Sequence, residues 1–213
     1  MPVSVHSTAT VHPNVDLGDG TQVGPYCVLG SLDGKPLTIG PDSVIRAHTI
    51  IYGGSEIGPR LETGHHALIR SGNLIGDNLR LGSYSSLEGG ATIGDFVRVH
   101  GRVEMTKAIL KDFTRIYAQS AITDNRRPPS YDNDVCVLEE GSIVMMQCLL
   151  LAGVTIGIGG HVAAKVVVGE DVQPNHMLLR DGTQKRLRDL WPPRYMGDYP
   201  DDAHPRLDRL HDR

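Results

Sequence analysis

The sequence predicts an all-β solenoid in which short strands and tight turns wind into a three-sided coil. First, an aliphatic residue recurs at every sixth position over most of the chain. Second, glycine is frequent, at 25 of 213 residues, and often directly follows that aliphatic residue. Third, aromatic residues make up only 5% of the chain, which favours thin, regular core layers. A sustained period of six fits neither a helix nor simple strand alternation, but it fits one strand and one turn.

The aliphatic residue that opens each group of six, here called the lead residue, can be followed along the chain. A first block contains Val5, Val11, Leu17, Val23 and Leu29. The longest block contains Ile39, Ile45, Ile51, Ile57, Thr63, Ile69, Ile75, Leu81, Leu87, Ile93, Val99 and Met105. Later blocks contain Leu110, Ile116 and Ile122, and then Leu138, Val144, Leu150, Ile156, Val162 and Val168. Three groups of six make a coil of about 18 residues, and such coils stack about 4.8 Å apart.

Two insertions and a tail interrupt the repeat. SLDGKP (31–36) is predicted to be a small loop, and TDNRRPPSYDND (123–134) must leave the coil as a longer one. The predicted organisation is therefore a β-helix domain over 1–178, with an extruded loop over 123–137, and a helix and tail over 179–213. Within that tail, GTQKRLRDLW (182–191) is compatible with a short helix, and the remainder is polar and interrupted by prolines.

Residues eighteen apart are predicted to stack on one corner of the coil. One corner gathers His48, His66, Tyr84 and Arg102, with His65 and His100 beside it. A second corner carries Gly54, Gly72 and Gly90, and the third carries Asp42, Arg60, Asn78 and Phe96. The first corner therefore holds four of the ten histidines, which is the strongest functional signal in the sequence.

The repeats resemble those of the left-handed parallel β-helix acyltransferases, the hexapeptide-repeat family, over about residues 5–175. The stretches TGHHALIR (63–70), NLIGDN (73–78) and ITDNRRPPS (122–130) are most similar to the branch that acylates nucleotide-linked amino sugars. The resemblance implies a left-handed coil, a homotrimer with active sites between subunits, and acetyl-CoA or a close thioester as the acyl donor. It also implies an amine acceptor on a sugar nucleotide.

Acyl transfer to an amine requires removal of a proton, a role that suits histidine. His65 lies two places after its lead residue, which is where related acyltransferases carry their base, and His66 matches a second histidine of the sugar-nucleotide branch. Both are therefore candidate catalytic residues. The lead residue here, Thr63, is the only one in its block that is not aliphatic.

The remaining candidates bind the two substrates. The substrate-binding candidates are His48, Arg70, Tyr84, Asn125, Arg126 and Arg127, because guanidinium forks match phosphate oxygens. LLAGVTIGIGGHVAAKVVVGEDVQP (150–174) resembles the family stretch that lines the pantetheine arm. The cofactor-binding candidates are Gly153, Gly159, Ala164, Lys165, Lys185 and Arg186.

Composition and charge limit the classes of partner that are expected. The formal charge of −4 shows no basic excess, so a nucleic-acid partner is not expected, and no apolar run approaches the ~18 residues of a membrane span. The first ten residues, MPVSVHSTAT, lack the pattern of a signal peptide. The three cysteines have no metal-ligand spacing and are expected to be buried thiols in a cytoplasmic protein. No metal requirement is expected.

Five alternatives stay open at this stage. The stacked histidines can be a solvent-facing ladder without chemistry, and the departing thiolate can take the proton in place of a side chain. The acceptor can be a small hydroxyl compound. Two other classes are a zinc protein resembling the γ-type carbonic anhydrases, which use three histidines, and a scaffold subunit without catalysis.

Overall fold

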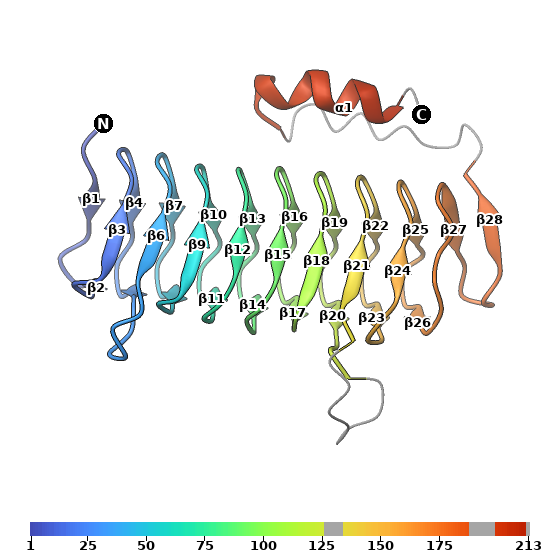
Figure 1. Ribbon diagram of the computed structural model, residues 1–213, viewed down its shortest axis with the longest axis horizontal. Coiled ribbons are helices and arrows are strands. Elements are labelled where there is room, and N and C mark those ends of the chain that lie inside the picture. Colours follow the sequence, from blue (N-terminus) through green and yellow to red (C-terminus); the bar gives the residue numbers. More distant parts are fainter. Residues whose placement is uncertain (126–133, 188–198, 212–213) are drawn as a thin grey trace.

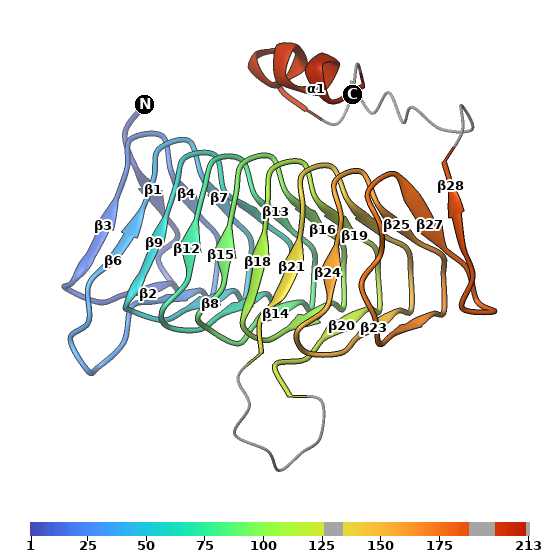
Figure 2. The same ribbon diagram turned by 45° about the vertical axis from the view of Figure 1, so that its right-hand side comes forward.

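The computed structural model describes residues 1–125, 134–187 and 199–211, and these form a three-sided parallel β-solenoid with one C-terminal helix (Figures 1 and 2). Each coil gives one short strand to each of three sheets, and each strand pairs with the equivalent strand of the next coil. Ile50, for example, pairs with Leu68, and Leu68 in turn pairs with Ser86, so each step along the sheet covers eighteen residues of sequence. The predicted all-β solenoid is confirmed.

The three sheets are named by their strand number among the described residues. The eleven-stranded sheet contains β1 (Ser4–Val5), β4 (Gln22–Val23), β7 (Val44–Ile45), β10 (Glu62–Thr63), β13 (Arg80–Leu81), β16 (Arg98–Val99), β19 (Arg115–Ile116), β22 (Ile143–Val144), β25 (His161–Val162), β27 (His176–Leu178) and β28 (Gln184–Arg186).

The other two sheets complete the prism. The nine-stranded sheet contains β2 (Thr10–Val11), β5 (Val28–Leu29), β8 (Ile50–Ile51), β11 (Leu68–Ile69), β14 (Ser86–Leu87), β17 (Glu104–Met105), β20 (Ala121–Ile122), β23 (Leu149–Leu150) and β26 (Val167–Val168). The eight-stranded sheet contains β3 (Val15–Leu17), β6 (Leu37–Ile39), β9 (Ser55–Ile57), β12 (Leu74–Ile75), β15 (Thr92–Ile93), β18 (Ala108–Leu110), β21 (Cys136–Leu138) and β24 (Thr155–Ile156).

The lead residues fill the interior of the solenoid. Ile51, Ile69 and Leu87, for example, are completely buried and stack on one another in consecutive coils. The step from Met105 to Leu110 is one residue short, yet Leu110 still pairs with Ile93, so the core column continues through a shorter coil. All three cysteines are buried as free thiols, as expected.

The three corners of the coil match the predicted columns. The histidine corner joins the eleven- to the nine-stranded sheet and carries Tyr26, His48, His66, Tyr84 and Arg102, all with φ near +60°. The glycine corner joins the nine- to the eight-stranded sheet and carries Gly54, Gly72 and Gly90. The helix corner joins the eight- to the eleven-stranded sheet and carries Asp42, Arg60, Asn78, Phe96 and Phe113. Both insertions, 30–36 and the segment between β20 and β21, leave from the glycine corner (Figure 1).

The C-terminal helix packs along the helix corner, on the opposite edge from the two insertions (Figure 1). A short 3-10 helix, η2 (Asp201–Ala203), leads into α1 (His204–His211). Tyr199, Ala203 and Leu207 bury an apolar patch against the stacked rings of Phe96 and Phe113.

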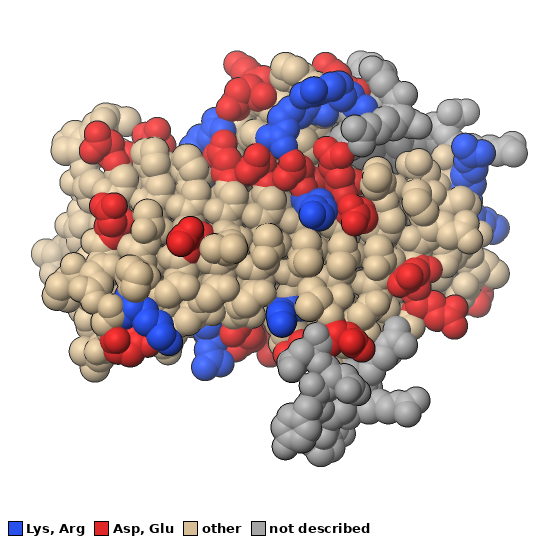
Figure 3. Space-filling model, in the orientation of Figure 1, with Lys and Arg blue, Asp and Glu red and all other residues tan. Residues whose placement is uncertain are grey.

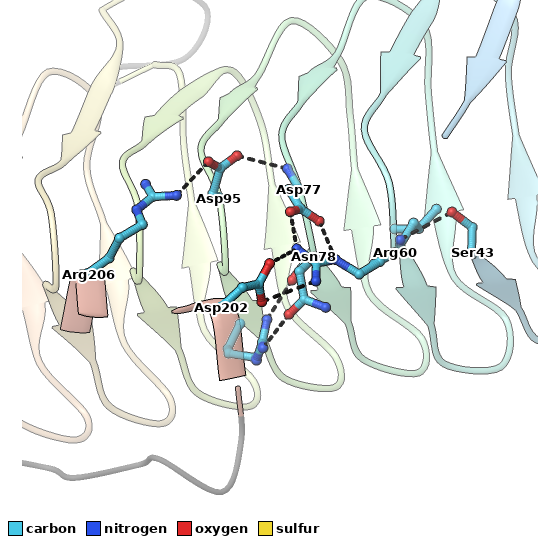
Figure 4. A network of polar contacts seen from close by, with 9 residues as sticks. Ser43, Arg60, Asp77, Asn78, Asp95, Asp202 and Arg206 are labelled. Carbon is cyan, nitrogen blue, oxygen red and sulfur yellow. Dashed lines mark hydrogen bonds and ion pairs between the residues drawn. The ribbon is translucent and has the colours of Figure 1, made fainter. Parts of the chain in front are cut away.

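Charged pairs flank that apolar patch. Arg206 lies over both phenylalanine rings and forms ion pairs with Asp95 (Nη1 to Oδ2, 2.9 Å) and Asp112. Arg60 bridges Asp77 and Asp202, and its hydrogen bond holds the pKa of the Asp202 carboxyl below its usual value (Figure 4). Figure 3 shows a band of carboxylates, in red, under α1.

The expectation of a short helix over 182–191 is wrong for residues 184–186. These form β28, which pairs antiparallel with β27. The turn between the two strands explains this, because Asp181 accepts hydrogen bonds from the backbone and hydroxyl of Thr183, and Gly182 has φ +81°. The helix lies further along, at 204–211, in the part of the tail that was expected to be irregular.

Candidate active site

A groove of about 500 Å³ runs along the outer face of the eleven-stranded sheet, where that sheet turns into the histidine corner. Its described lining comes from five consecutive coils: Arg46, Glu62, Thr63, Gly64, His65, Arg80, Leu81, Gly82, Ser83, Arg98, Val99, His100, Gly101, Arg115 and Tyr117. The groove therefore combines histidines, a hydroxyl and several guanidinium groups, a combination suited to proton transfer and to binding an anion.

Two glycines create the floor of the groove. The position after the lead residue carries a large side chain in Arg46, His100 and Tyr117, but glycine at 64 and 82. A Cβ at Gly64 would lie 2.2 Å from the Ser83 backbone nitrogen, and one at Gly82 would lie 2.3 Å from that of Gly101. No other residue fits there, so the sequence opens a gap between Arg46 at one end and the stacked rings of His100 and Tyr117, 4.3 Å apart, at the other.

Thr63, the polar lead residue, holds Arg46 at the end of this groove. Its buried hydroxyl accepts the backbone N–H of Arg46 at 3.0 Å and contacts the Thr49 hydroxyl at 3.2 Å. Its backbone carbonyl accepts a second bond from Arg46 Nη1, also at 3.0 Å. Threonine at this lead position therefore has a structural reason, because its hydroxyl and carbonyl oxygens fix the backbone and the side chain of Arg46.

Two ion pairs link Arg46, Glu62 and Arg80 on three consecutive coils. Glu62 accepts from Arg46 Nη2 at 2.8 Å and from Arg80 Nε at 3.1 Å, so that one carboxylate positions two guanidinium groups. Arg98 and Arg115 follow on the next two strands, where Tyr199 of the C-terminal segment packs against both of them. The C-terminal segment thus supports one side of the groove.

The side chains of the two predicted catalytic histidines, which are neighbours in sequence, have different surroundings. His65 is exposed and lines the groove, and its backbone N–H donates to Ser83 Oγ at 3.0 Å. His66 instead stacks between His48 and Tyr84, with ring centroids 4.6 Å and 4.9 Å away and nearly parallel planes. With Tyr26 stacked on His48 at 5.0 Å, these residues form an aromatic ladder along the histidine corner.

The other predicted substrate-binding residues lie at two different corners: Tyr84, whose backbone N–H donates to the His65 carbonyl at 3.0 Å, and His48 share the corner of His65, whereas Arg70 and Asn125 do not. His48 and Tyr84 belong to the aromatic ladder. Arg70 is exposed beside the glycine corner and pairs with Glu88 at 3.1 Å, and Asn125 lies at that same corner, at the start of the long insertion. Arg126 and Arg127 lie outside the described residues.

The predicted cofactor-binding residues are spread over all three corners. Gly153 belongs to the glycine corner and Gly159 to the helix corner, whereas Ala164 and Lys165 continue the histidine corner towards the C-terminal end. Lys185 and Arg186 are exposed on β28. Within one chain these six residues do not form a single cradle, and their role stays a prediction.

Several groove residues were missed by reading the sequence. Glu62, Arg80, Arg98 and Arg115 each directly precede a lead residue, a position that faces outward from the sheet. Comparing the residue before the lead residue in successive coils would have shown this column of charged side chains. Arg46 and Tyr117 occupy the position after the lead residue, which on this sheet is glycine at 24, 64 and 82.

Other features bear on the alternative functions. Within residues 1–125, 134–187 and 199–211, no three His, Cys, Asp or Glu side chains come close enough together to hold a metal ion. A second groove of about 530 Å³ lies on the outer face of the eight-stranded sheet, which carries few charges (Figure 3). Its described lining includes Leu74, Thr92 and one carboxylate, Glu56, but no histidine. No described helix is both long and apolar enough to cross a membrane.

Comparison with solved structures identifies the architecture. A UDP-N-acetylglucosamine acyltransferase of Francisella novicida superimposes with a TM-score of 0.67 at 14% identity, covering 97% of this chain and 78% of that one. The corresponding enzyme of Bacteroides fragilis gives a TM-score of 0.61 at 15% identity over 85% of this chain and 73% of that one. The fold is the one these acyltransferases have. The predicted left-handed β-helix class is therefore confirmed.

Sequence comparison finds a local relationship. An acyl-[acyl-carrier-protein]–UDP-N-acetylglucosamine O-acyltransferase of Brucella ovis is 39% identical over 54 residues, which is 25% of this chain. The same match in Brucella abortus has equal identity and length. The matched region spans only 18% of the length of these curated relatives. No protein-family profile matches the chain.

Proposed function

We propose that this protein is an acyltransferase that moves an acyl group from a thioester donor to a nucleotide-linked amino sugar, with His65 as the general base. The observation that carries the proposal is the position of His65 in a groove lined by guanidinium groups. Support also comes from the relatives, which are named as UDP-N-acetylglucosamine acyltransferases, and from the fold shared with such enzymes.

The chemistry divides between the base and the cations of the groove. As the acceptor nucleophile attacks the thioester carbonyl, the imidazole of His65 takes its proton. The negative charge that develops on the carbonyl oxygen is stabilised by a nearby positive group, for which the partly exposed Arg46 is the candidate. The C–S bond then breaks, and the thiolate leaves with a proton returned by the imidazolium.

The acceptor atom and the donor distinguish two candidate functions. The sequence resemblance favours acetyl-CoA and an amine, which gives an amide. The Brucella relatives favour the second candidate, because their name specifies an acyl-carrier-protein donor and an O-acyl product. Each donor is to be incubated with UDP-N-acetylglucosamine and with an amino-sugar nucleotide, and the purified product treated with alkaline hydroxylamine. An ester is cleaved under these conditions, whereas an amide persists.

A homotrimer would complete this site. A groove on the face of a thin prism stays open on one side, and deep ligand sites commonly form where subunits meet. Arg70 and Asn125, on the glycine corner, would then serve the groove of a neighbouring subunit. Analytical ultracentrifugation tests this part of the proposal, since a monomer at micromolar concentration would contradict it.

The role of His65 is tested by substitution. His65→Ala is expected to lower kcat by about 10²–10⁴-fold while leaving the far-ultraviolet circular dichroism spectrum unchanged, because the ring is exposed. His66→Ala, which removes a ring from the aromatic ladder, is expected to cost less than about tenfold. His6→Ala, in the first coil, serves as a neutral control. Full activity in His65→Ala would refute the assignment.

A further inference from the structure

Three arginines stand in line on the outer face of the eleven-stranded sheet. Arg80 pairs in register with Arg98, and Arg98 pairs with Arg115, so the three occupy equivalent positions on consecutive strands. Neighbouring strands are about 4.8 Å apart, and like charges placed directly opposite one another destabilise a sheet. Arg98 and Arg115 are buried against Tyr199, whereas Arg80 is partly exposed, so Arg80 is the member of this column that a ligand can reach.

The guanidinium groups are held in place by the protein itself. Arg98 Nη1 donates to the Asn78 backbone carbonyl and Arg98 Nη2 to the Asn78 side-chain oxygen, each at 2.6 Å. Arg115 Nε donates to the Tyr199 hydroxyl at 3.1 Å. Glu62 fixes Arg46 and Arg80 at the more open end. Because these side chains are already ordered, a ligand would lose little affinity to ordering them.

The charge of the groove is opposite to that of the whole chain. Its described lining contains four arginines and one glutamate, whereas the chain carries a formal charge of −4. A local positive groove on an acidic protein concentrates anions. Its volume of about 500 Å³ is within the usual range for a small-molecule site.

We propose that this groove is a phosphate-binding site, with Arg80 as the main contact. Arg46 flanks Arg80 at one end, and the buried Arg98 and Arg115 lie at the other, where Tyr199 packs against them. The ligand class is a diphosphate-bearing molecule, because planar guanidinium forks in series match successive phosphate groups. The assignment of the ligand to a substrate rests on the proposed function, which it deepens by naming residues that bind that substrate.

Two substrates of the proposed reaction carry this chemistry. A sugar nucleotide supplies a diphosphate on the acceptor side, and coenzyme A supplies one on the donor side. The position of His65 in the same groove is compatible with either source. The source is therefore left to separate arms of the experiment.

The experiment measures binding by isothermal titration calorimetry with inorganic pyrophosphate, UDP and coenzyme A as probes. Arg80→Gln is expected to weaken pyrophosphate binding by about tenfold or more. The matched control is Arg209→Gln, which removes another exposed arginine whose Nε donates to the Pro205 carbonyl at 3.2 Å within α1, and it is expected to change affinity less than about twofold. The affinity is also expected to fall as salt is added.

The outcomes separate cleanly. An Arg80-dependent loss for UDP identifies the acceptor as the source, and one for coenzyme A identifies the donor. No pyrophosphate binding at millimolar concentration, an equal loss in both variants, or an Arg80 effect on neither UDP nor coenzyme A would overturn the proposal. Arg80-dependent UDP binding without any acyl transfer would leave this site standing and remove the proposed function. Turnover that requires His65 but does not depend on Arg80 would leave the proposed function standing and remove the phosphate site at Arg80.

Discussion

The polar lead residue Thr63 allows a sharp test of how the groove is built. Valine has the shape of threonine without the hydroxyl, so Thr63→Val removes the acceptor of the Arg46 backbone N–H and leaves the surrounding packing in place. A buried donor left without its partner costs about 1–3 kcal/mol, and the extra buried methyl group returns up to about 0.8 kcal/mol. The Thr49 hydroxyl keeps its bond to the Gly64 carbonyl at 3.1 Å. The expected net destabilisation is therefore about 1–2 kcal/mol.

The assay is thermal unfolding followed by circular dichroism, together with amide hydrogen exchange. For a domain of this size, a loss of about 1–2 kcal/mol lowers Tm by about 2–8 °C. The Arg46 amide is expected to exchange faster in Thr63→Val, because its hydrogen-bond acceptor is gone.

Thr21→Val is the matched control. Thr21 is also completely buried, but its hydroxyl only donates to the Gly40 carbonyl at 3.3 Å, and that carbonyl keeps a shorter bond from Ser43 at 2.8 Å. Its removal is expected to change Tm by less than about 2 °C. If Thr63→Val were as stable as Thr21→Val, and Arg46 exchange were unchanged, the role given to Thr63 would be wrong.

Two further predictions concern the C-terminal helix and a buried histidine. Arg206→Ala is expected to weaken docking of α1 by about 1–2 kcal/mol, seen as faster amide exchange over 204–209. The control is Arg209→Ala, because Arg209 Nε donates within the helix to the Pro205 carbonyl, and it is expected to leave exchange unchanged. Equal exchange in both variants would contradict the docking role of Arg206. Burial lowers the pKa of His161 from 6.5 to about 4, so this histidine stays neutral in the fold while the unfolded chain takes up a proton below pH 6.5. Stability is then expected to fall by up to about 3 kcal/mol as pH drops from about 6.5 to about 4, and urea unfolding of His161→Gln should show a flatter pH dependence over that window.

The sequence predicted the fold because the interior of a solenoid repeats at a fixed spacing. Each lead residue meets its equivalents in the coils before and after, so one period specifies the core, the corners and the stacking of His48 on His66. The groove was harder to predict because it depends on departures from the period. Glycine at 64 and 82 opens it, and Thr63 and Arg46 shape its end.

The C-terminal helix was missed for a different reason. Its apolar contacts are few, and they depend on Phe96 and Phe113, which lie about a hundred residues earlier and have no periodic relation to Tyr199 or Leu207. The signals that did exist were local: acidic residues at 201 and 202 followed by Pro205 in the first helical turn. The turn at Asp181 and Gly182, which favours a hairpin, was outweighed by the helix-forming residues after it.

The salt bridges of the C-terminal segment change how the solenoid is expected to unfold. In a stacked array, each coil senses only its nearest neighbours, so opening can begin at either end and spread one coil at a time. Asp202 and Arg206 reach Arg60, Asp95 and Asp112, across 142, 111 and 94 residues of sequence. These ion pairs couple the middle coils into one cooperative unit. The ends are therefore expected to fray, while the coils that carry the groove unfold together.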